Sequence, residues 1–331
     1  MASDGGSSVD ASAVDAGGGP DGGAAPDAGP SDAGPSDVDA GDGAGWRREE
    51  DVPEAIQEIA VEAHDGRIWI AGGLDAAATT VATVRVYDPA TRAWSEGPAL
   101  PAPRHHMNLV SHGGDLYALG GMQTLAFEPL DTAWVLRAGA SDWEPIASLP
   151  RDRGAAAAAS VGDLIVMAGG NESRGGLAAI TLIYDPALDA WSLGAEIPTA
   201  REHLSAVGHD GELYVLAGRR NSLGSTRAEL EIYDPVADTW RAGPELPYPR
   251  GGFDAAILEG GIYAVGGEEP ATVLTSVHRF DLTAGEWAAA PDTMRPHHGH
   301  GVATLDGRLY VVAGGDGPAL NAFAFVESYA P

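Results

Sequence analysis

Short apolar runs that end on a pair of small residues recur along the chain. Each run has the length of a buried strand, and the small pair suits a position that needs a positive φ angle or the close approach of another backbone. The runs cover residues 68–70, 116–119, 164–167, 213–216, 262–265 and 309–312. The pairs are Gly72-Gly73, Gly120-Gly121, Ala168-Gly169, Ala217-Gly218, Gly266-Gly267 and Ala313-Gly314. The second member recurs every 47 to 49 residues, which predicts a repeat protein of six units.

Each repeat contains signals for four short strands. Before the apolar run of the second unit, residues 104–110 alternate in polarity and predict a first strand, followed by a turn at residues 111–114. In the third unit Tyr184 ends one strand and Trp191 begins the next, with an Asp-Pro turn between them. The tryptophans of this last strand are Trp46, Trp94, Trp143, Trp191, Trp240 and Trp287. Four antiparallel strands per repeat describe a blade of a β-propeller.

The two ends of the sequence complement each other. The last unit stops at Tyr329 and Pro331 without a tryptophan strand, whereas the strand signal at Trp46 has no repeat of its own. Pairing of these two segments would complete the sixth blade, close the ring and leave no free sheet edge. We therefore predict an all-β fold, a six-bladed β-propeller of four-stranded antiparallel blades over residues 46–331, whose ring is closed by the N-terminal strand.

Residues 1–45 have a different composition from the rest of the chain. They contain nine Asp, no Arg and little besides Ala, Gly, Pro and Ser, so they predict a disordered acidic tail. Such runs are similar to the tethers that follow the lipidated cysteine of bacterial envelope lipoproteins. If an upstream signal has been removed, we expect an extracytoplasmic protein (periplasmic, surface or secreted). If Met1 is the native start, we expect a cytoplasmic one, since no signal peptide is visible.

Composition and charge exclude several classes of function. The chain has no cysteine, which rules out disulfides, thiolate metal ligands and thiol nucleophiles. No run approaches the ~18–20 apolar residues of a transmembrane segment. The net charge of −29 repels phosphate backbones, so we expect no nucleic-acid binding. All 19 basic residues are arginines, and their positions matter more than their number.

The small pair, the tyrosine and the tryptophan seven residues later, six times in phase, resemble the kelch-repeat family. The resemblance covers about residues 46–331. It departs from the family pattern at three pairs that begin with Ala, at residues 133–136 in place of Tyr-Asp-Pro, and at Phe280 in place of Tyr. The resemblance implies packing roles for these motif residues and a binding face formed by variable loops. It also implies a relation to bacterial six-bladed members that act as sialic-acid mutarotases through an arginine-lined pocket with an acid/base carboxylate.

Arginines recur where the first strand of each repeat begins. In the kelch family such arginines often surround the mouth of the central channel, and strand alternation predicts that Arg104, His106 and Asn108 share the side facing the axis. The variable loops, at residues 74–81, 122–132, 170–180, 219–228, 268–276 and 315–323, reach the same face. The candidate ligand-binding residues are Arg104, His106, Asn108, Arg153, Arg201, His203, Arg219, Arg220, Arg250, His297 and His298.

These residues predict an anionic peptide or sugar as the ligand. An equally weighted alternative is that the arginines pair with carboxylates such as Glu202 and Asp152 and only hold loops. We expect a monomeric binding module for a protein or a small anionic or carbohydrate ligand, rather than an enzyme, and no metal or cofactor despite the clustered histidines. One alternative is a sialic-acid-type mutarotase or epimerase with Glu58, Glu202 or Asp254 as acid/base candidates. Another is an exported surface module without a small ligand.

Overall fold

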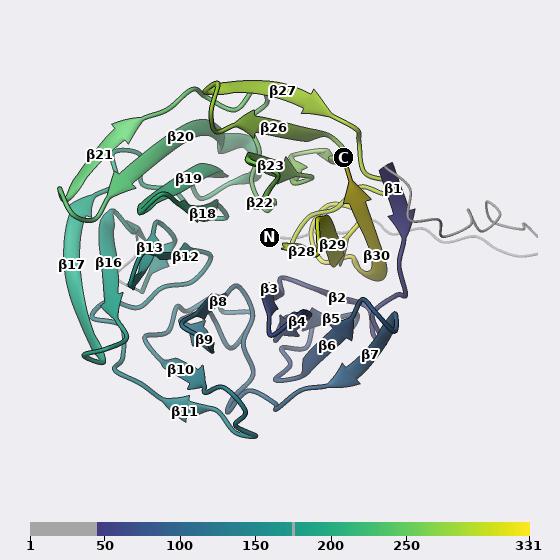
Figure 1. Ribbon diagram of the computed structural model, residues 1–331, viewed down its shortest axis with the longest axis horizontal. Helices are drawn as coiled ribbons and strands as arrows, with labels where there is room; N and C mark the ends of the chain where they lie inside the picture. Colours follow the sequence, from purple (N-terminus) through teal and green to yellow (C-terminus); the bar gives the residue numbers. More distant parts are fainter. Residues whose placement is uncertain (1–44, 174–175) are drawn as a thin grey trace, which may run out of the picture. The chain divides into compact units, whose positions relative to one another are not determined.

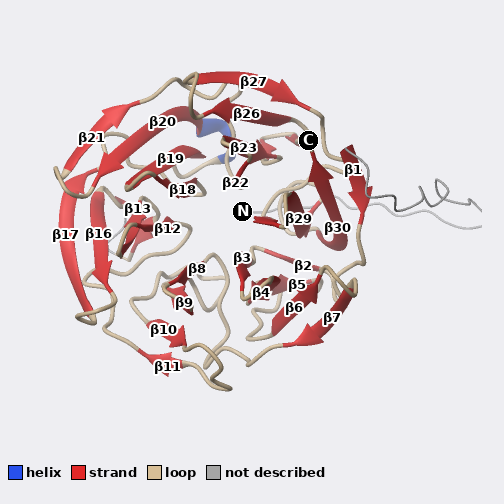
Figure 2. Cartoon of the chain, viewed as in Figure 1, coloured by secondary structure: helices blue, strands red, loops and turns tan. Residues whose placement is uncertain are grey.

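The computed structural model describes residues 45–173 and 176–331, which form a ring of six four-stranded antiparallel sheets (Figure 1). One strand of each sheet lies nearest the axis and the others follow outward, as in the predicted propeller. Within the described residues the only helical element is the short 3₁₀ turn η1 (Leu223–Ser225), shown in Figure 2. The same residues include no helix whose length and hydropathy would let it cross a membrane. The six-bladed, all-β prediction is confirmed.

The blades are named here from the axis outward. The first three are β3 (Ala60–His64), β4 (Arg67–Ala71), β6 (Val84–Asp88) and β7 (Ala93–Glu96); β8 (Asn108–His112), β9 (Asp115–Leu119), β10 (Ala133–Leu136) and β11 (Glu144–Pro145); β12 (Ala157–Val161), β13 (Leu164–Ala168), β16 (Ile180–Asp185) and β17 (Ala190–Glu196). The next two are β18 (Ser205–His209), β19 (Glu212–Arg219), β20 (Thr226–Asp234) and β21 (Thr239–Ala242); β22 (Asp254–Leu258), β23 (Gly261–Val265), β26 (Val277–Asp281) and β27 (Glu286–Ala290). The sixth is β28 (Gly301–Leu305), β29 (Arg308–Gly315), β30 (Ala322–Ala330) and β1 (Gly45–Arg48). Small two-stranded sheets are β2 (Ile56–Gln57) with β5 (Leu74–Asp75), β14 (Asn171–Glu172) with β15 (Gly176–Leu177), and β24 (Glu268–Glu269) with β25 (Thr272–Val273).

Strand β1 closes the ring. It pairs antiparallel with β30 in the sixth blade, with Trp46 opposite Tyr329. The two aromatic rings lie 5.1 Å apart between centroids, the same arrangement as Tyr184 and Trp191 within the third blade at 4.9 Å. The prediction that the N-terminal strand supplies the missing tryptophan strand is confirmed. The predicted disordered tail lies outside the described residues, apart from Gly45.

The tryptophans join neighbouring blades. The indole N–H of Trp191 donates a hydrogen bond of 2.8 Å to the carbonyl oxygen of Ala147 in the preceding blade. Trp240 does the same to Ala195 at 3.1 Å, and Trp46 to Pro291 at 2.9 Å. The bond recurs for the remaining repeat tryptophans, Trp94, Trp143 and Trp287. Since each indole packs in its own blade and bonds to another, these residues have the packing role that the sequence indicated.

The small pairs dock each blade against the next one. Gly120 and Gly121 have φ angles of +62° and +90°, and the N–H of Gly121 donates a 2.7 Å hydrogen bond to the carbonyl oxygen of Arg153 in the following blade. Equivalent bonds join Gly73 to Arg104, Gly170 to Arg201, Gly218 to Arg250 and Gly267 to His297. In the third blade the pair is Gly169-Gly170, so the pair predicted at Ala168-Gly169 is wrong by one residue. Strand β13 includes Ala168 and ends one residue later than expected.

A closed ring of six backbone hydrogen bonds encircles the axis, one residue from each blade. Every member has a φ angle between +52° and +60°. The N–H of each donates to the carbonyl oxygen of the member in the preceding blade, over 2.6–3.1 Å. The members of this axial ring are Glu58, His106, Ala155, His203, Gly252 and Gly299. The ring therefore fixes six Cα positions around one point and brings their side chains together.

Candidate functional site

The loops that follow the second strand of the blades surround a hollow of about 480 Å³ at the mouth of the propeller. Two repeat positions contribute its polar floor. The first is the axial ring, through Glu58, His106 and His203. The second is the residue directly after the small pair, through Asn171, Arg219 and Glu268, while the apolar Met122 holds the same position in the second blade. Its outer wall carries apolar side chains, of which Phe127 and Leu320 are about half exposed.

Arg219 is the centre of the ionic network on this floor. Its Nε donates to Oε1 of Glu202 at 3.0 Å, and its Nη1 forms an ion pair with Glu268. Its Nη2 lies 2.9 Å from Nε2 of His203. Glu268 also lies 3.8 Å from Nε2 of His298, measured from Oε2. The single guanidinium is thus already held by two carboxylates.

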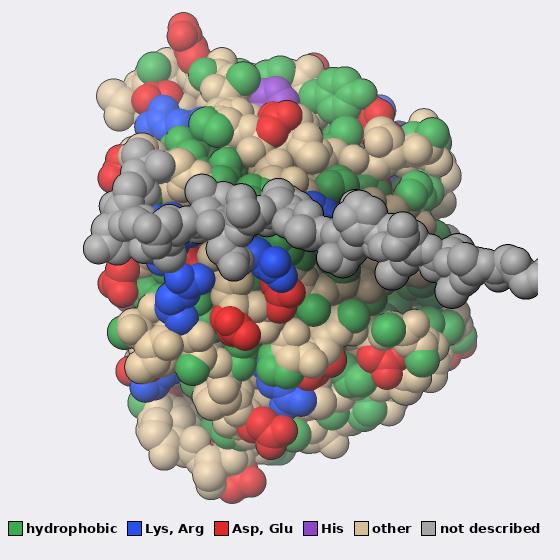
Figure 3. Space-filling model, turned by 90° about the vertical axis from the view of Figure 1, so that its right-hand side faces the viewer, with side chains coloured by type: hydrophobic (Ala, Val, Ile, Leu, Met, Phe, Trp, Pro, Cys, Tyr) green, Lys and Arg blue, Asp and Glu red, His purple; other side chains and the backbone are tan. Residues whose placement is uncertain are grey.

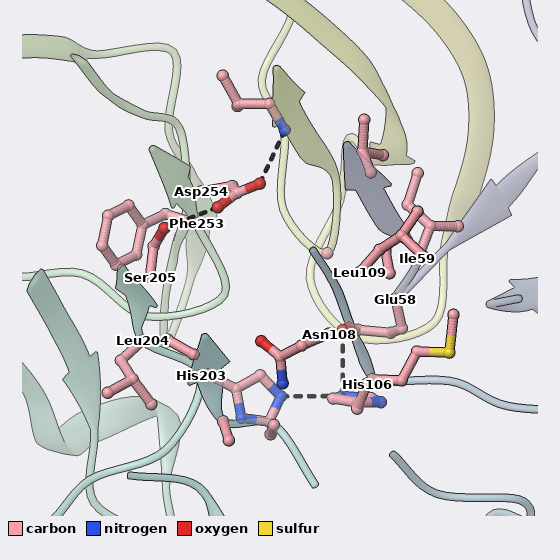
Figure 4. A pocket seen from close by; sticks show the side chains of 18 of the residues that line it. Glu58, Ile59, His106, Asn108, Leu109, His203, Leu204, Ser205, Phe253 and Asp254 are labelled. Atoms are coloured by element: carbon pink, nitrogen blue, oxygen red, sulfur yellow. Dashed lines mark hydrogen bonds and ion pairs between the residues drawn. The ribbon is translucent and has the colours of Figure 1, made fainter. Parts of the chain in front are cut away.

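Glu58 and two histidines meet next to this network. Figure 4 shows their side chains, from three different blades, pointing toward one another. Nε2 of His106 lies 3.0 Å from Oε2 of Glu58 and 3.0 Å from Nε2 of His203. Among the described residues this is the one group of three whose ligand atoms, all within 4.8 Å of one another, could hold a metal ion.

Three neighbouring histidines at the base of the mouth, His105, His106 and His203, are neutral at physiological pH. Burial lowers the pKa of His106 to about 3, helped by the positive charge of Arg219. Burial also lowers the pKa of His105 to about 4 and that of His203 well below its ordinary value. The charges of this part of the floor are therefore those of Glu58, Glu202, Glu268 and Arg219, which leave it acidic rather than basic.

The predicted arginine lining of the mouth is wrong. Arg104, Arg153, Arg201, Arg250 and His297 are at most 3% exposed and lie inside their own blades. The physical reason is the axial ring, because the positive φ two residues after each of these positions ends the strand alternation on which the prediction depended. These side chains turn away from the axis.

Inside the blades the arginines bind backbone carbonyls and buried acids. Arg201 donates to the carbonyl oxygens of Ala217 at 2.5 Å and Val215 at 3.1 Å, and forms an ion pair with Glu231. Arg153 pairs in the same way with Glu172, at 2.7 Å. Arg104 binds Thr132, and Arg250 binds Ser276. His297, at the equivalent position of the sixth blade, binds Glu327. The alternative that the arginines hold structure thus describes this set, with different carboxylates from those expected.

The other predicted residues are divided between two hollows. His106, His203, Arg219 and His298 line the mouth. Asn108 lines a channel on the other side of the axial ring. Arg220 is exposed in the loop after β19. Of the catalytic candidates, Glu58 borders both hollows and Glu202 lines the mouth, whereas Asp254 lies in the channel only.

The channel below the axial ring has a volume of about 160 Å³ and is lined by the carboxyl groups of Glu62 and Asp254 in addition to that of Glu58. Asp254 accepts hydrogen bonds from Ser205 Oγ at 2.7 Å and from the N–H of Val302 at 2.8 Å, so it ties three blades together (Figure 4). Burial raises its pKa to about 6. Burial and the charge of Asp254 raise the pKa of Glu62 to about 8. The carboxyl groups of Asp254 and Glu62 therefore affect the stability of the propeller and do not line the mouth.

Glu62→Gln should stabilise the protein at alkaline pH. The folded-state pKa of Glu62, about 8, lies above its ordinary value of 4.5, so the folded state binds this proton more tightly and loses stability as pH rises from 4.5 to 8. The variant removes that loss, by about 2–4 kcal/mol at pH 9, and gains nothing at pH 4.5. Urea denaturation across this range measures the difference. The exposed Glu286→Gln controls for the loss of one negative charge, and an equal gain at both pH values would contradict the assignment.

Sequence reasoning missed Glu268 and Phe127 as mouth residues, and Glu62 as a channel residue. Glu268 had a usable signal, because it directly follows Gly266-Gly267 as Arg219 follows Ala217-Gly218. The structure shows that the two residues occupy equivalent positions. Arg219 forms an isolated β-bridge with Glu202, and Glu268 forms one with Gly251. Phe127 had no such signal, because it lies in a loop without a repeat equivalent.

Two family models of Kelch repeats match this chain. The family model of the KLHDC2/KLHL20/DRC7 Kelch-repeats domain matches residues 148–315, and that of the Kelch motif matches residues 58–101. Similar proteins include beta-scruin of Limulus polyphemus, 28% identical over 43% of this chain and 16% of that protein. An F-box/kelch-repeat protein of Arabidopsis thaliana is 26% identical over 50% of each chain. Kelch-like protein 40 of Mus musculus is 32% identical over 30% of this chain and 17% of that protein. The chain thus spans half or less of the length of these curated relatives.

Among solved structures, the one described as "Structure of YjhT" is similar over most of the ring. It superposes with a TM-score of 0.71 over 84% of this chain and 95% of that chain, at 14% sequence identity. At this identity the likeness concerns the fold. It supports the six-bladed arrangement without assigning a role to any side chain of the mouth.

Proposed function

Because this chain belongs to the kelch-repeat family, we propose that it is a binding module whose ligand occupies the mouth of the propeller. The observation that carries the proposal is the hollow of about 480 Å³, with a charged floor and a partly apolar wall. Concave sites of this size with a few convergent polar groups are typical of small-molecule binding. The rigid ring of blades holds the loops in place, so the site is largely preformed.

The floor and the wall together suit a sugar-sized polar ligand. Carboxylate, imidazole and guanidinium groups can bind hydroxyl groups, and the exposed ring of Phe127 offers a face for an apolar sugar surface. An anionic ligand has less support than the sequence suggested. The arginines at the start of the first strands are buried inside the blades, and Arg219 already pairs with two carboxylates. Arg220 is an exposed cation that directly precedes Asn221 and Ser222 of the hollow, and it could bind a sugar carboxylate there. A neutral sugar and a sugar acid are therefore the two ligand classes to compare.

Charges of both signs are mixed on the part of the outer surface that one side view shows. On the side of the propeller seen in Figure 3, basic and acidic side chains lie beside one another. Ion pairs of this kind include Arg85 with Glu54, at 3.1 Å, and Arg48 with Asp51, at 2.8 Å. We also propose that the propeller acts as a monomer, and outside the cytoplasm if an upstream signal is removed, as the composition of residues 1–45 suggests.

Ligand binding should depend on the mouth and on Phe127. We expect one or more members of a panel of neutral sugars, sugar acids including sialic acid, and acidic peptides to raise the melting temperature of the protein. Calorimetry should then show about 5-fold weaker binding by Phe127→Ala, since an aromatic contact contributes about 1 kcal/mol. Leu188→Ala, at an exposed apolar residue in the turn between β16 and β17, is the matched control and should bind normally. Binding by peptides alone, or unchanged binding by Phe127→Ala, would contradict a sugar site at the mouth.

A sugar mutarotase or epimerase is the second candidate function. The observation in its favour is the contact between Glu58 and the neutral imidazole of His106 at 3.0 Å, because such a pair can transfer a proton to or from a bound sugar. If it is correct, the protein should accelerate anomer exchange of the sugar that binds, as measured by NMR. Glu58→Gln should abolish the acceleration, and unaltered anomer exchange in the wild type would exclude this candidate.

A further inference from the structure

Three side chains of the axial ring point their ligand atoms at one place. We propose that Glu58, His106 and His203 bind a first-row divalent metal ion, with Zn²⁺ as its representative, at the axis of the propeller. This departs from the expectation, drawn from the sequence, that the site holds no metal. The proposal is independent of the sugar proposed above, because it concerns the ion alone.

The distances match a metal site. Ligand atoms about 2.1 Å from one ion and at right angles to each other lie roughly 3 Å apart. Nε2 of His106 is 3.0 Å from Oε2 of Glu58 and 3.0 Å from Nε2 of His203. Two of the three separations therefore already match neighbouring ligands of one ion, and the third, between Glu58 and His203, lies within 4.8 Å.

The neighbours of His106 make its Nε2 an acceptor. The carbonyl oxygen of Thr124, 3.2 Å from Nε2 of His105, can only accept a proton, so His105 carries its hydrogen there. Nδ1 of His105 is then an acceptor and lies 2.5 Å from Nδ1 of His106, which must donate to it. His106 therefore presents an unprotonated Nε2 to Glu58 and His203. Two acceptors face each other across 3.0 Å, an arrangement that a cation would satisfy.

The neighbours of His203 have the same effect. Arg219 can only donate hydrogen bonds, so the Nε2 of His203 that faces its guanidinium group is also an acceptor. Glu202 lies against the other ring nitrogen, Nδ1. Nη2 of Arg219 lies 2.9 Å from that Nε2 and is the donor that a metal would displace. Arg219 would keep its bonds to Glu202 and Glu268 after this exchange.

The backbone prepares space and charge for the ion. The three ligands occupy equivalent positions of the axial ring, and the other three positions hold only Ala155, Gly252 and Gly299. A side chain at Gly299 would collide with Glu58, since its Cβ would lie 2.7 Å from Oε1 of Glu58. Three carboxylates against one guanidinium make the surroundings attractive to a dication.

The donor set selects the kind of metal. Two imidazoles and one carboxylate favour zinc and other first-row divalent ions, whereas calcium and magnesium prefer sites made of oxygen atoms. Three protein ligands leave further coordination positions open, and the ligands border the mouth hollow. A bound ion would therefore face the space in which a small ligand or a water molecule could complete its coordination.

Zinc titration of the full chain tests the site without any organic ligand. After dialysis against a chelator, calorimetry with ZnCl₂ should show one zinc per chain. NMR should show two histidine rings bound through Nε2, a readout that needs no variant. Glu202→Gln should weaken binding about 10- to 100-fold, because it orients His203. Glu58→Gln, His106→Gln and His203→Gln should each weaken it further, whereas His209→Gln, at the opposite end of β18, should not.

Several results would overturn the proposal. One is the absence of zinc binding by the wild type at millimolar zinc. Another is unchanged affinity in the three ligand variants, or NMR shifts at histidines other than His106 and His203. Arg219→Ala should bind zinc more tightly than the wild type, because the competing guanidinium is gone, and weaker binding by this variant would also contradict the site. Circular dichroism of each variant establishes that it is folded, and Glu58→Gln preserves the shape of the side chain.

Discussion

Arg201→Met should lower the free energy of unfolding by about 3–5 kcal/mol, because it leaves the buried carboxylate of Glu231 without its partner. Arg201 is fully buried and also serves the carbonyl oxygens of Ala217, Val215 and Thr199. Methionine has a similar length and cannot replace any of these hydrogen bonds. Urea denaturation followed by tryptophan fluorescence measures the loss.

Two variants separate this effect from a general effect of charge. Arg220→Met removes an exposed arginine from the next strand's loop and should change stability by less than about 0.5 kcal/mol. The double variant Arg201→Met with Glu231→Leu should recover part of the loss, since no unpaired charge stays buried. A small loss in Arg201→Met together with weaker ligand binding would instead support the role at the mouth that the sequence suggested.

Gly72→Ala should destabilise the protein by about 2–4 kcal/mol. Gly72 has a φ of +65°, which costs alanine roughly 1 kcal/mol, and a methyl group there would overlap the carbonyl oxygen of Arg104 in the next blade. That oxygen cannot move freely, because it accepts the 2.7 Å hydrogen bond from Gly73.

Gly66→Ala is the matched control for this prediction. Gly66 lies in the same blade with a φ of +68°, but a methyl group at this position would meet nothing within 4 Å. It should therefore show only the conformational cost of about 1 kcal/mol. The difference in denaturation midpoint between the two variants reports the contact between blades. Equal losses would mean that the small pair is selected for its backbone angles alone.

The fold could be predicted from the sequence because its signals repeat. Trp46 has no repeat of its own, and Tyr329 has no tryptophan strand after it. These two facts identified the closing strand, because pairing the two segments leaves neither sheet edge without a partner. The error at Ala168 arose because Ala168-Gly169 and Gly169-Gly170 fit the same pattern of small residues. The hydrogen bond from Gly170 to Arg201 and the positive φ angles of Gly169 and Gly170 distinguish them.

The candidate site was less predictable, for a reason that lies in the backbone. Strand alternation predicts one direction for Arg201 and His203, but the φ of +52° at His203 separates them into the blade interior and the mouth. A glutamate or an alanine does not signal a left-handed conformation and a histidine does so only weakly, because this conformation is imposed here by the bonds between blades. His106 and His203 could be selected as candidates by type and place. Their convergence with Glu58, which comes from a third blade, depends on the closed ring.

The pairing of β1 with β30 also determines when the molecule can be finished during synthesis. It joins residues 281 positions apart, and the first of these strands emerges from the ribosome long before its partner. An open array of repeats can grow from neighbour to neighbour, but a circle is complete only when its last strand arrives, so the final step spans nearly the whole described chain. Until then strands β1 and β29 each keep an edge without a partner. A chain cut short before β30 would keep such an edge available to another chain, which makes the terminal strand a safeguard against misassembly as well as a part of the sixth blade.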